Sequence, residues 1–191
     1  MAKLILASKS PRRAELLERL GLSYTVISAD CDEWFPDGLG PEEIVQYISR
    51  EKAHAAANMV APEDIVITAD TLVFLDGQRL GKPRDEAEAF SMLSALSGRE
   101  HTVCTGVTVT QGNRTLSRAV STRVRFAPLD EATIRAYIRT GEPMDKAGAY
   151  GIQAYGALLV ETIDGDFFNV MGLPLRTLAQ MLEKFGLRVL A

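Results

Sequence analysis

The most constraining feature of the sequence is a strand-like run that leads directly into a helix start. Leu4–Ala7 is a short apolar run, and Ser10 followed by Pro11 is typical of a helix N-terminus with a hydroxyl cap and a proline at the first helical position. Arg12 and Arg13 fall in the first turn, where positive charge opposes the helix dipole unless an anion joins it. The junction predicts a binding site for phosphate oxygens; a capped helix with solvated arginines is the alternative.

Composition limits the class of protein. The chain has 191 residues, of which 47% are hydrophobic and 24% charged, enough apolar material for a core and a single domain over residues 1–191. It carries 25 acidic against 21 basic side chains, a formal charge of −4. This balance argues against a surface that binds nucleic acid by neutralising phosphates, although a small polyanion could bind a local basic pocket.

Cysteine use and hydropathy indicate a cytoplasmic protein. Cys31 and Cys104 are the only cysteines, and they form no CxxC or Cys/His spacing typical of zinc sites or redox pairs. The run 4–7 is too short for a signal-peptide core, and no stretch approaches the roughly 20 apolar residues of a membrane span. We expect neither secretion nor membrane insertion.

Helix and turn signals divide the rest of the chain. Proline, acidic or glycine signals at their ends predict helices over 41–59, 86–96, 130–139 and 174–186. Strands are expected over 24–28 and 65–67, around turns at Asp76-Gly77 and Gly112-Asn113, and in a last hairpin that pairs 158–163 with 167–171. The glycine-rich segment 143–156 is predicted to be a binding loop.

Asp70 is the first candidate catalytic carboxylate. It follows the apolar run 65–67, so we expect it at the carboxyl end of a buried strand. There it could hold Mg²⁺ or take a proton from water, although most such residues are turn residues or helix caps. Asp32 and Glu33 supply further carboxylates, or only make a loop soluble.

Three lysines, Lys52, Lys82 and Lys146, are candidate phosphate ligands. A lysine is usually a solvated charge, but the Gly81-Lys82-Pro83 turn fixes one near the hairpin that follows Asp70. His54 and His101 share no motif with an acid or a nucleophile, and we expect both to be structural.

Six motifs together resemble the Maf family of nucleoside triphosphate pyrophosphatases. In chain order they are SKSPRR at 8–13, REKA at 50–53, ADT at 69–71, GKPR at 81–84, DKAGAYGIQ at 145–153 and VMGLP at 170–174. The resemblance covers essentially the whole chain.

This resemblance implies a fold, an assembly and a reaction. The fold is α/β of the Maf/inosine-triphosphatase type, with an elongated mixed sheet flanked by helices and a cleft between two lobes. The assembly is a homodimer. The reaction is hydrolysis between the α and β phosphates of a nucleoside triphosphate, with Mg²⁺ or Mn²⁺ as the divalent cofactor.

The resemblance also implies residue roles. Asp70 is the proton acceptor and a metal ligand, and Glu33 is a second candidate metal ligand. The phosphates are held by Ser8, Arg13, Lys52 and Lys82.

Three further positions, Arg12, Thr71 and Gln153, match the subgroup that takes dTTP and UTP. The alternatives are a 7-methyl-GTP pyrophosphatase, in which Trp and Gln are typical at the first two positions, and a nucleotide-binding regulator of septum formation without turnover. One departure from the family pattern is Cys31, which stands where members often carry an aliphatic residue.

Overall fold

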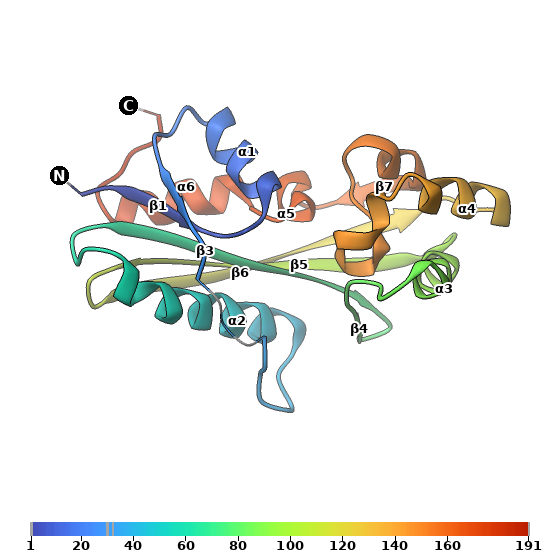
Figure 1. Cartoon of the computed structure of the whole chain (residues 1–191), viewed down its shortest axis with the longest axis horizontal. Coiled ribbons are helices and arrows are strands. Elements are labelled where there is room, and N and C mark those ends of the chain that lie inside the picture. Colours follow the sequence, from blue (N-terminus) through green and yellow to red (C-terminus); the bar gives the residue numbers. More distant parts are fainter. Residues whose placement is uncertain (1, 30, 32, 191) are drawn as a thin grey trace. The chain divides into compact units, whose positions relative to one another are not determined.

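The computed structural model describes residues 2–29, 31 and 33–190. Within them, seven strands form one mixed sheet in the order β2-β1-β3-β5-β6-β7, with β4 paired to β3 (Figure 1). The strands are β1 (Leu4–Ala7), β2 (Thr25–Ile27), β3 (Ile65–Leu75), β4 (Gln78–Leu80), β5 (Glu100–Gln111), β6 (Arg114–Phe126) and β7 (Val160–Asp164). β1 is parallel to β2 and β3, whereas β3–β4 and β6–β7 are antiparallel. The expected mixed α/β fold is confirmed.

Apart from α5, the α-helices begin within one residue of the predicted starts. They are α1 (Pro11–Arg19), α2 (Pro41–Ala56), α3 (Glu86–Leu96), α4 (Glu131–Arg139), α5 (Phe167–Met171) and α6 (Leu175–Lys184), with 3-10 helices η1 (Ala57–Met59), η2 (Glu142–Asp145), η3 (Ala147–Ala149) and η4 (Ala154–Leu159). Asp85 and Asp130 cap α3 and α4 by accepting hydrogen bonds from first-turn N–H groups. In the described part of the chain, no helix has the length and apolar character needed to cross a membrane.

The residues group into two compact units. The first contains 1–70, 105–120 and 172–191, and the second contains 71–104 and 121–171. The strands β3, β5 and β6 contribute residues to both. A single domain over the whole chain stays a prediction.

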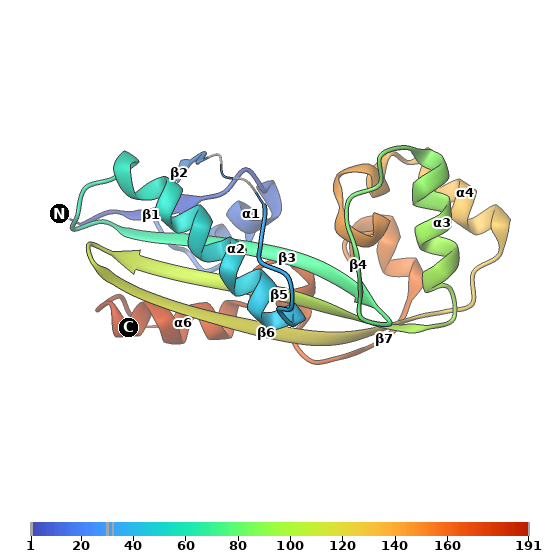
Figure 2. The same ribbon diagram turned by 90° about the horizontal axis from the view of Figure 1, so that it is seen from below.

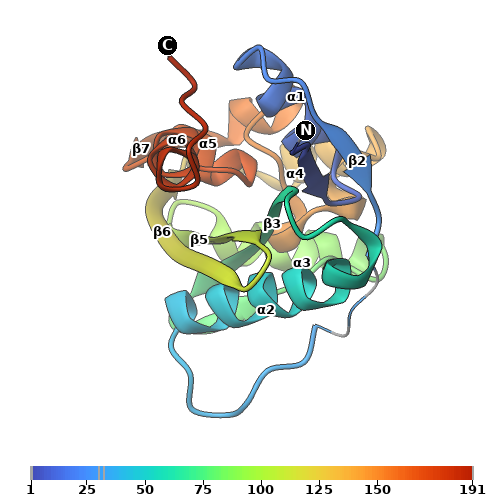
Figure 3. The same ribbon diagram turned by 90° about the vertical axis from the view of Figure 1, so that its left-hand side faces the viewer.

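Helices cover both faces of the sheet in the first unit: α2 lies on one face, and α1 and α6 on the other (Figures 1 and 3). The helix α2 approaches the sheet closely at Gly106 of β5. A methyl group added there would lie 2.2 Å from the carbonyl oxygen of Val45, which belongs to the backbone of α2. Only glycine allows this approach, because neither backbone can give way.

The strand β3 differs from the expected pattern. It runs unbroken from Ile65 to Leu75, so Asp70 lies in the middle of a strand and not at its end. Aspartate is disfavoured inside strands. The flanking residues are nearly all buried and β-forming, and an ion pair described below offsets the burial of the carboxylate. The expected hairpin turn follows at Asp76-Gly77, both with positive φ.

The predicted last hairpin is wrong. β7 pairs with β6, and residues 167–171 form the short helix α5. The carboxylate of Asp166 accepts hydrogen bonds from the N–H groups of Phe168 and Asn169, which starts a helix. The Asn169 amide then donates to the carbonyl oxygen of Val103 and to the hydroxyl of Thr122. These buried polar contacts select helix over strand for an apolar segment that suits either.

In the second unit, α3 packs against α4 and η3, and α4 packs against η2 (Figure 2). The core of this unit contains an aromatic group in which His101, Phe126 and Tyr150 make edge-to-face contacts. His101 is 3% exposed, and its Nε2 lies 2.7 Å from the Tyr150 hydroxyl. The expectation that this histidine is structural fits its place in the core.

Burial lowers the pKa of His101 from its ordinary 6.5 to about 4. As the pH falls, the unfolded chain therefore binds a proton at this histidine before the folded chain does. The free energy of unfolding decreases between pH 6.5 and 4, and at pH 4 the loss is roughly 3 kcal/mol. We expect His101→Gln to flatten this part of a urea-unfolding pH profile. His54→Gln is the control, since the side chain of His54 is 70% exposed. Equal slopes for wild type and His101→Gln would contradict the assignment.

Candidate functional site

The junction between β1 and α1 carries the first group of predicted residues. Ser10 occupies the N-cap position, but its hydroxyl makes no capping hydrogen bond, so the predicted hydroxyl cap is wrong. The Ser8 hydroxyl instead accepts from the N–H of Ser10 at 3.2 Å and from Nη1 of Arg13 at 3.3 Å. Ser8 thus orders the backbone that leads into the helix.

Arg13 is not a solvated arginine. Its Nε donates to the carbonyl oxygen of Gly172 at 2.8 Å, which fixes the guanidinium against the segment that begins α6. Burial lowers its pKa, and the attraction of Asp70 acts in the opposite direction. A guanidinium stays charged under these conditions, so the site holds a fixed, partly desolvated cation.

Lys52 joins two carboxylates. Its Nζ lies 2.6 Å from Oδ1 of Asp70 and 3.0 Å from Oε1 of Glu33. The side chain of Asp70 is 7% exposed and that of Lys52 19%. The second oxygen of Asp70, Oδ2, is buried without a hydrogen-bond partner among the described residues.

Electrostatics favour the charged form of Lys52. Burial alone would lower its pKa, but the charge of Asp70, the hydrogen bond to it and the charge of Glu33 together raise it. Arg13 acts weakly in the other direction, and both cations therefore lie within electrostatic range of Asp70.

Buried hydroxyl groups tie α2 to β3 beside this ion pair. The Thr68 hydroxyl donates to the carbonyl oxygen of Ser49 at 2.6 Å, and the Ser49 hydroxyl lies 2.8 Å from that of Thr108. Thr68 shares a strand face with Asp70, and Ser49 lies one helical turn before Lys52. The tie therefore sets the register between the two elements that carry the ion pair.

The residues fit a divalent cation that shares its coordination with a ligand. Mg²⁺ prefers carboxylate oxygens and is typically held by one or two of them plus phosphates and waters. Asp70 Oδ2 is a buried oxygen available for this role, and the Glu33 carboxylate is paired with Lys52, as Asp70 is. In the part that the structure describes, no three His, Cys, Asp or Glu side chains gather as a metal site. Asp32 lies outside the described residues.

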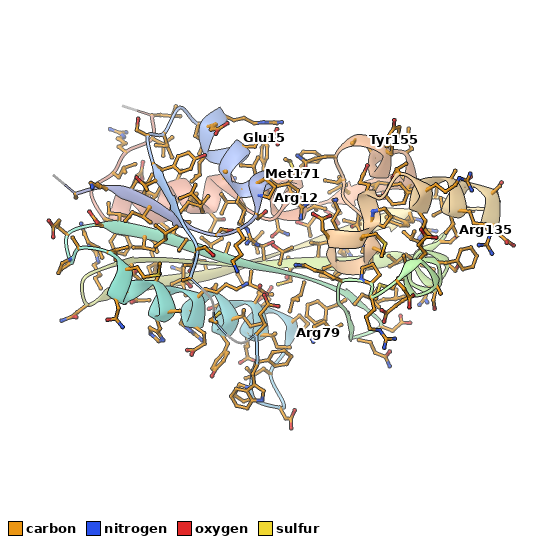
Figure 4. All side chains as sticks on the ribbon, viewed as in Figure 1. Arg12, Glu15, Arg79, Arg135, Tyr155 and Met171 are labelled. Carbon is orange, nitrogen blue, oxygen red and sulfur yellow. The ribbon has the colours of Figure 1, made fainter. Side chains whose placement is uncertain are left out.

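The other predicted residues are spread over both units. Arg12 projects from α1 in the first unit (Figure 4). Thr71, Lys82 and Gln153 belong to the second. There the N–H of Gly148 donates to the carbonyl oxygen of Gly81 at 3.0 Å, which joins the turn that carries Lys82 to the glycine-rich segment.

Lys146, a candidate phosphate ligand by sequence, is engaged within its own segment. Its Nζ donates to the carbonyl oxygen of Glu142 at 2.6 Å and to Oδ1 of Asp145 at 2.7 Å.

Sequence reasoning missed the residues that support the site. Gly172 contributes a backbone carbonyl, which no side-chain pattern reveals. Thr68 interrupts an apolar strand with a hydroxyl and was the one available signal, because a buried polar group needs a partner.

The fold and site define a mixed α/β protein with a buried, cation-paired carboxylate within electrostatic range of an arginine in the first turn of a helix. A model described as Maf-like protein matches residues 3–185, and the chain belongs to the Maf family.

Three relatives carry the name dTTP/UTP pyrophosphatase. The protein of Symbiobacterium thermophilum is 50% identical over 97% of this chain and 95% of its own. Those of Bacillus pumilus and Pelotomaculum thermopropionicum are 48% and 47% identical, over 98% and 100% of both chains. A solved HAM1 protein from Coxiella burnetii aligns with a TM-score of 0.47 and 18% identity, over 68% of this chain and 75% of that one. The family assignment therefore rests on sequence.

The ion pair predicts strong coupling between Lys52 and Asp70. We expect Lys52→Met to destabilise the wild type by about 3 kcal/mol in urea unfolding, because it leaves a buried carboxylate without its cation. In an Asp70→Asn background the cost should fall by roughly 2 kcal/mol. The surface pair of Arg19 and Glu15, also 2.6 Å apart but about half exposed, should show coupling near zero. Equal costs of Lys52→Met in both backgrounds would contradict a supporting role for the pair.

Proposed function

We propose that the protein is a nucleoside triphosphate pyrophosphatase that hydrolyses dTTP and UTP to the monophosphate and pyrophosphate. The observation that carries the proposal is the Asp70 carboxylate, which is fixed by Lys52 through one oxygen while the other is buried without a partner among the described residues. Membership of the Maf family and the names of close relatives support the same reaction.

In the proposed mechanism, Asp70 orients a water molecule for attack on the α phosphorus and accepts its proton. Lys52 holds the carboxylate in place. Arg13, the N–H groups at the start of α1 and Ser8 bind phosphate oxygens, and Lys82 adds a further cation. A divalent cation held by Asp70 and Glu33 would stabilise negative charge on the phosphates as the leaving pyrophosphate departs.

Base selection is assigned to Arg12, Thr71 and Gln153. The Gln153 amide offers both a donor and an acceptor, which suits the edge of a uracil or thymine base. Polar contacts of this kind discriminate strongly, because the wrong base leaves buried groups unpaired. We further propose, from the family resemblance, that a single Maf domain spans residues 1–191 and acts as a cytoplasmic homodimer.

Asp70→Asn should abolish turnover while nucleotide binding persists. Losing the proton acceptor is expected to lower kcat by about 10²- to 10⁴-fold. Pyrophosphate release is measured with Mg²⁺ or Mn²⁺ against dTTP, UTP, CTP, GTP, ATP and 7-methyl-GTP, and affinity by calorimetry. Undiminished turnover would remove Asp70 from the mechanism. Binding without release by the wild type would instead favour the regulator of septum formation.

The double variant Arg12→Trp/Thr71→Gln tests the substrate class. It places at both positions the residues typical of the 7-methyl-GTP subgroup. We expect kcat/KM for dTTP and UTP to fall at least tenfold relative to 7-methyl-GTP. An unchanged ratio would refute the specificity assignment. If the wild type prefers 7-methyl-GTP, the proposed substrates are wrong, but the proposed pyrophosphatase reaction still holds.

A further inference from the structure

Two side chains outside the six family motifs hold the segment that carries Gln153. Tyr137 lies near the end of α4, and Glu142 begins η2. The Tyr137 hydroxyl donates to Oε1 of Glu142 at 3.0 Å. Tyr137 is 4% exposed, so this contact is mostly shielded from water.

The pair binds the backbone on both sides of Gln153. On one side, the N–H of Gly151 donates to the Tyr137 hydroxyl at 3.2 Å. On the other, the N–H groups of Gly156 and Tyr155 donate to Oε1 and Oε2 of Glu142 at 3.1 and 3.2 Å. Three backbone contacts thus bracket a stretch of six residues.

Close packing holds the same stretch. A methyl group at Gly156 would lie 1.8 Å from the carbonyl oxygen of Gly151, and one at Gly151 would lie 2.6 Å from Cε of Lys146. Lys146 in turn donates to the carbonyl oxygen of Glu142, so the side chain that packs on Gly151 is itself held by Glu142.

The backbone next to Gln153 is strained. Ala154, the following residue, has φ 51°, and Ala149 has φ 58°. A left-handed conformation is unfavourable at a residue with a Cβ, because the Cβ comes too close to the following carbonyl oxygen. Such strain persists only where the surroundings impose it, and it is concentrated at functional sites. Here the surroundings are the contact to Tyr137 before the left-handed Ala154 and the contacts to Glu142 after it.

We propose that Tyr137 and Glu142 are positioning residues for base selection, which hold Gln153 in the orientation that distinguishes uracil and thymine from cytosine. The inference rests on the proposed function, in which Gln153 contacts the base. Hydrogen-bond readout needs the amide placed to within about 0.5 Å, so a looser segment loses discrimination before it loses turnover. The Glu142 carboxylate accepts from three donors, which are the Tyr137 hydroxyl and the N–H groups of Tyr155 and Gly156.

The hydroxyl of Tyr137 acts as the donor to Glu142. Burial, with Glu142 nearby, raises the pKa of Tyr137 above its ordinary value, so the phenol stays protonated. Tyr137→Phe therefore removes the contact to Glu142 and the acceptor for Gly151 while the ring keeps its place in the core.

The test compares kcat and KM for dTTP, UTP and CTP in the full-length wild type, Tyr137→Phe and Glu142→Gln. We expect the kcat/KM preference for UTP over CTP to fall about tenfold in each variant, through KM for UTP, with kcat within twofold of wild type. In a Gln153→Ala background, Tyr137→Phe should change the preference no further. Loss of thermal stability with an unchanged preference would overturn the proposal, because a merely structural role predicts that result.

Tyr24→Phe is the matched control. The Tyr24 hydroxyl also contacts a glutamate carboxylate and a backbone group, Glu18 Oε1 at 3.2 Å and the carbonyl oxygen of Ala14 at 2.9 Å. Its removal should change neither kcat nor the preference for UTP over CTP.

The inference and the proposed function can fail separately. If the wild type hydrolyses UTP and CTP equally well, the positioning role is overturned and the pyrophosphatase survives. If the wild type releases no pyrophosphate, the proposed function has failed, and calorimetric affinities for UTP and CTP then test the same variants. A tenfold loss of binding preference would support the positioning role, and an unchanged or absent preference would overturn it.

Discussion

The ion pair between Lys52 and Asp70 is the contact on which the candidate site depends. It joins a helix to the centre of a buried strand, where a lone carboxylate would be costly. Because one oxygen is taken by the lysine, the other is fixed in direction as well as in position. A carboxylate that reacts with a positioned water needs this restraint, because a small misplacement of the reacting groups lowers the rate strongly.

The surrounding first unit is organised to keep α2 and β3 in one register. Gly106 allows the helix backbone to approach the sheet, and the hydroxyl of Thr68 binds the helix backbone one turn before Lys52. Both devices use backbone atoms as partners. A shift of the helix by one residue would break them and would also separate Lys52 from Asp70, so fold register and site geometry are determined by the same contacts.

Local signals predicted the elements well and the supporting contacts poorly. Asp85, Asp130 and the Asp76-Gly77 turn act through neighbouring backbone groups, so their effect is visible in the sequence. The strand end predicted at Asp70 and the strand predicted over 167–171 are wrong, because both outcomes depend on residues distant in sequence. These are Lys52 for the carboxylate, and Thr122 with Val103 for the helix. The candidate phosphate-binding and base-selecting residues were assigned through motifs. No local rule could have supplied Glu142, whose partners are the Tyr137 hydroxyl and the backbone N–H groups of Tyr155 and Gly156.

The residues proposed for chemistry and those proposed for base selection fall largely in different units. Asp70, the proposed proton acceptor, and Lys52 belong to the first unit. The second unit contains Thr71, Lys82, Gln153 and the Tyr137–Glu142 pair. β3 carries Asp70 and Thr71 as neighbours, and successive side chains of a strand point to opposite faces. In the proposed function, chemistry therefore depends on the hydroxyl and ion-pair network around the sheet. Base selection depends on a strained, glycine-rich segment held by the Tyr137 hydroxyl and the Glu142 carboxylate. Substitutions in that segment can alter which base is accepted without disturbing the contacts that hold Asp70.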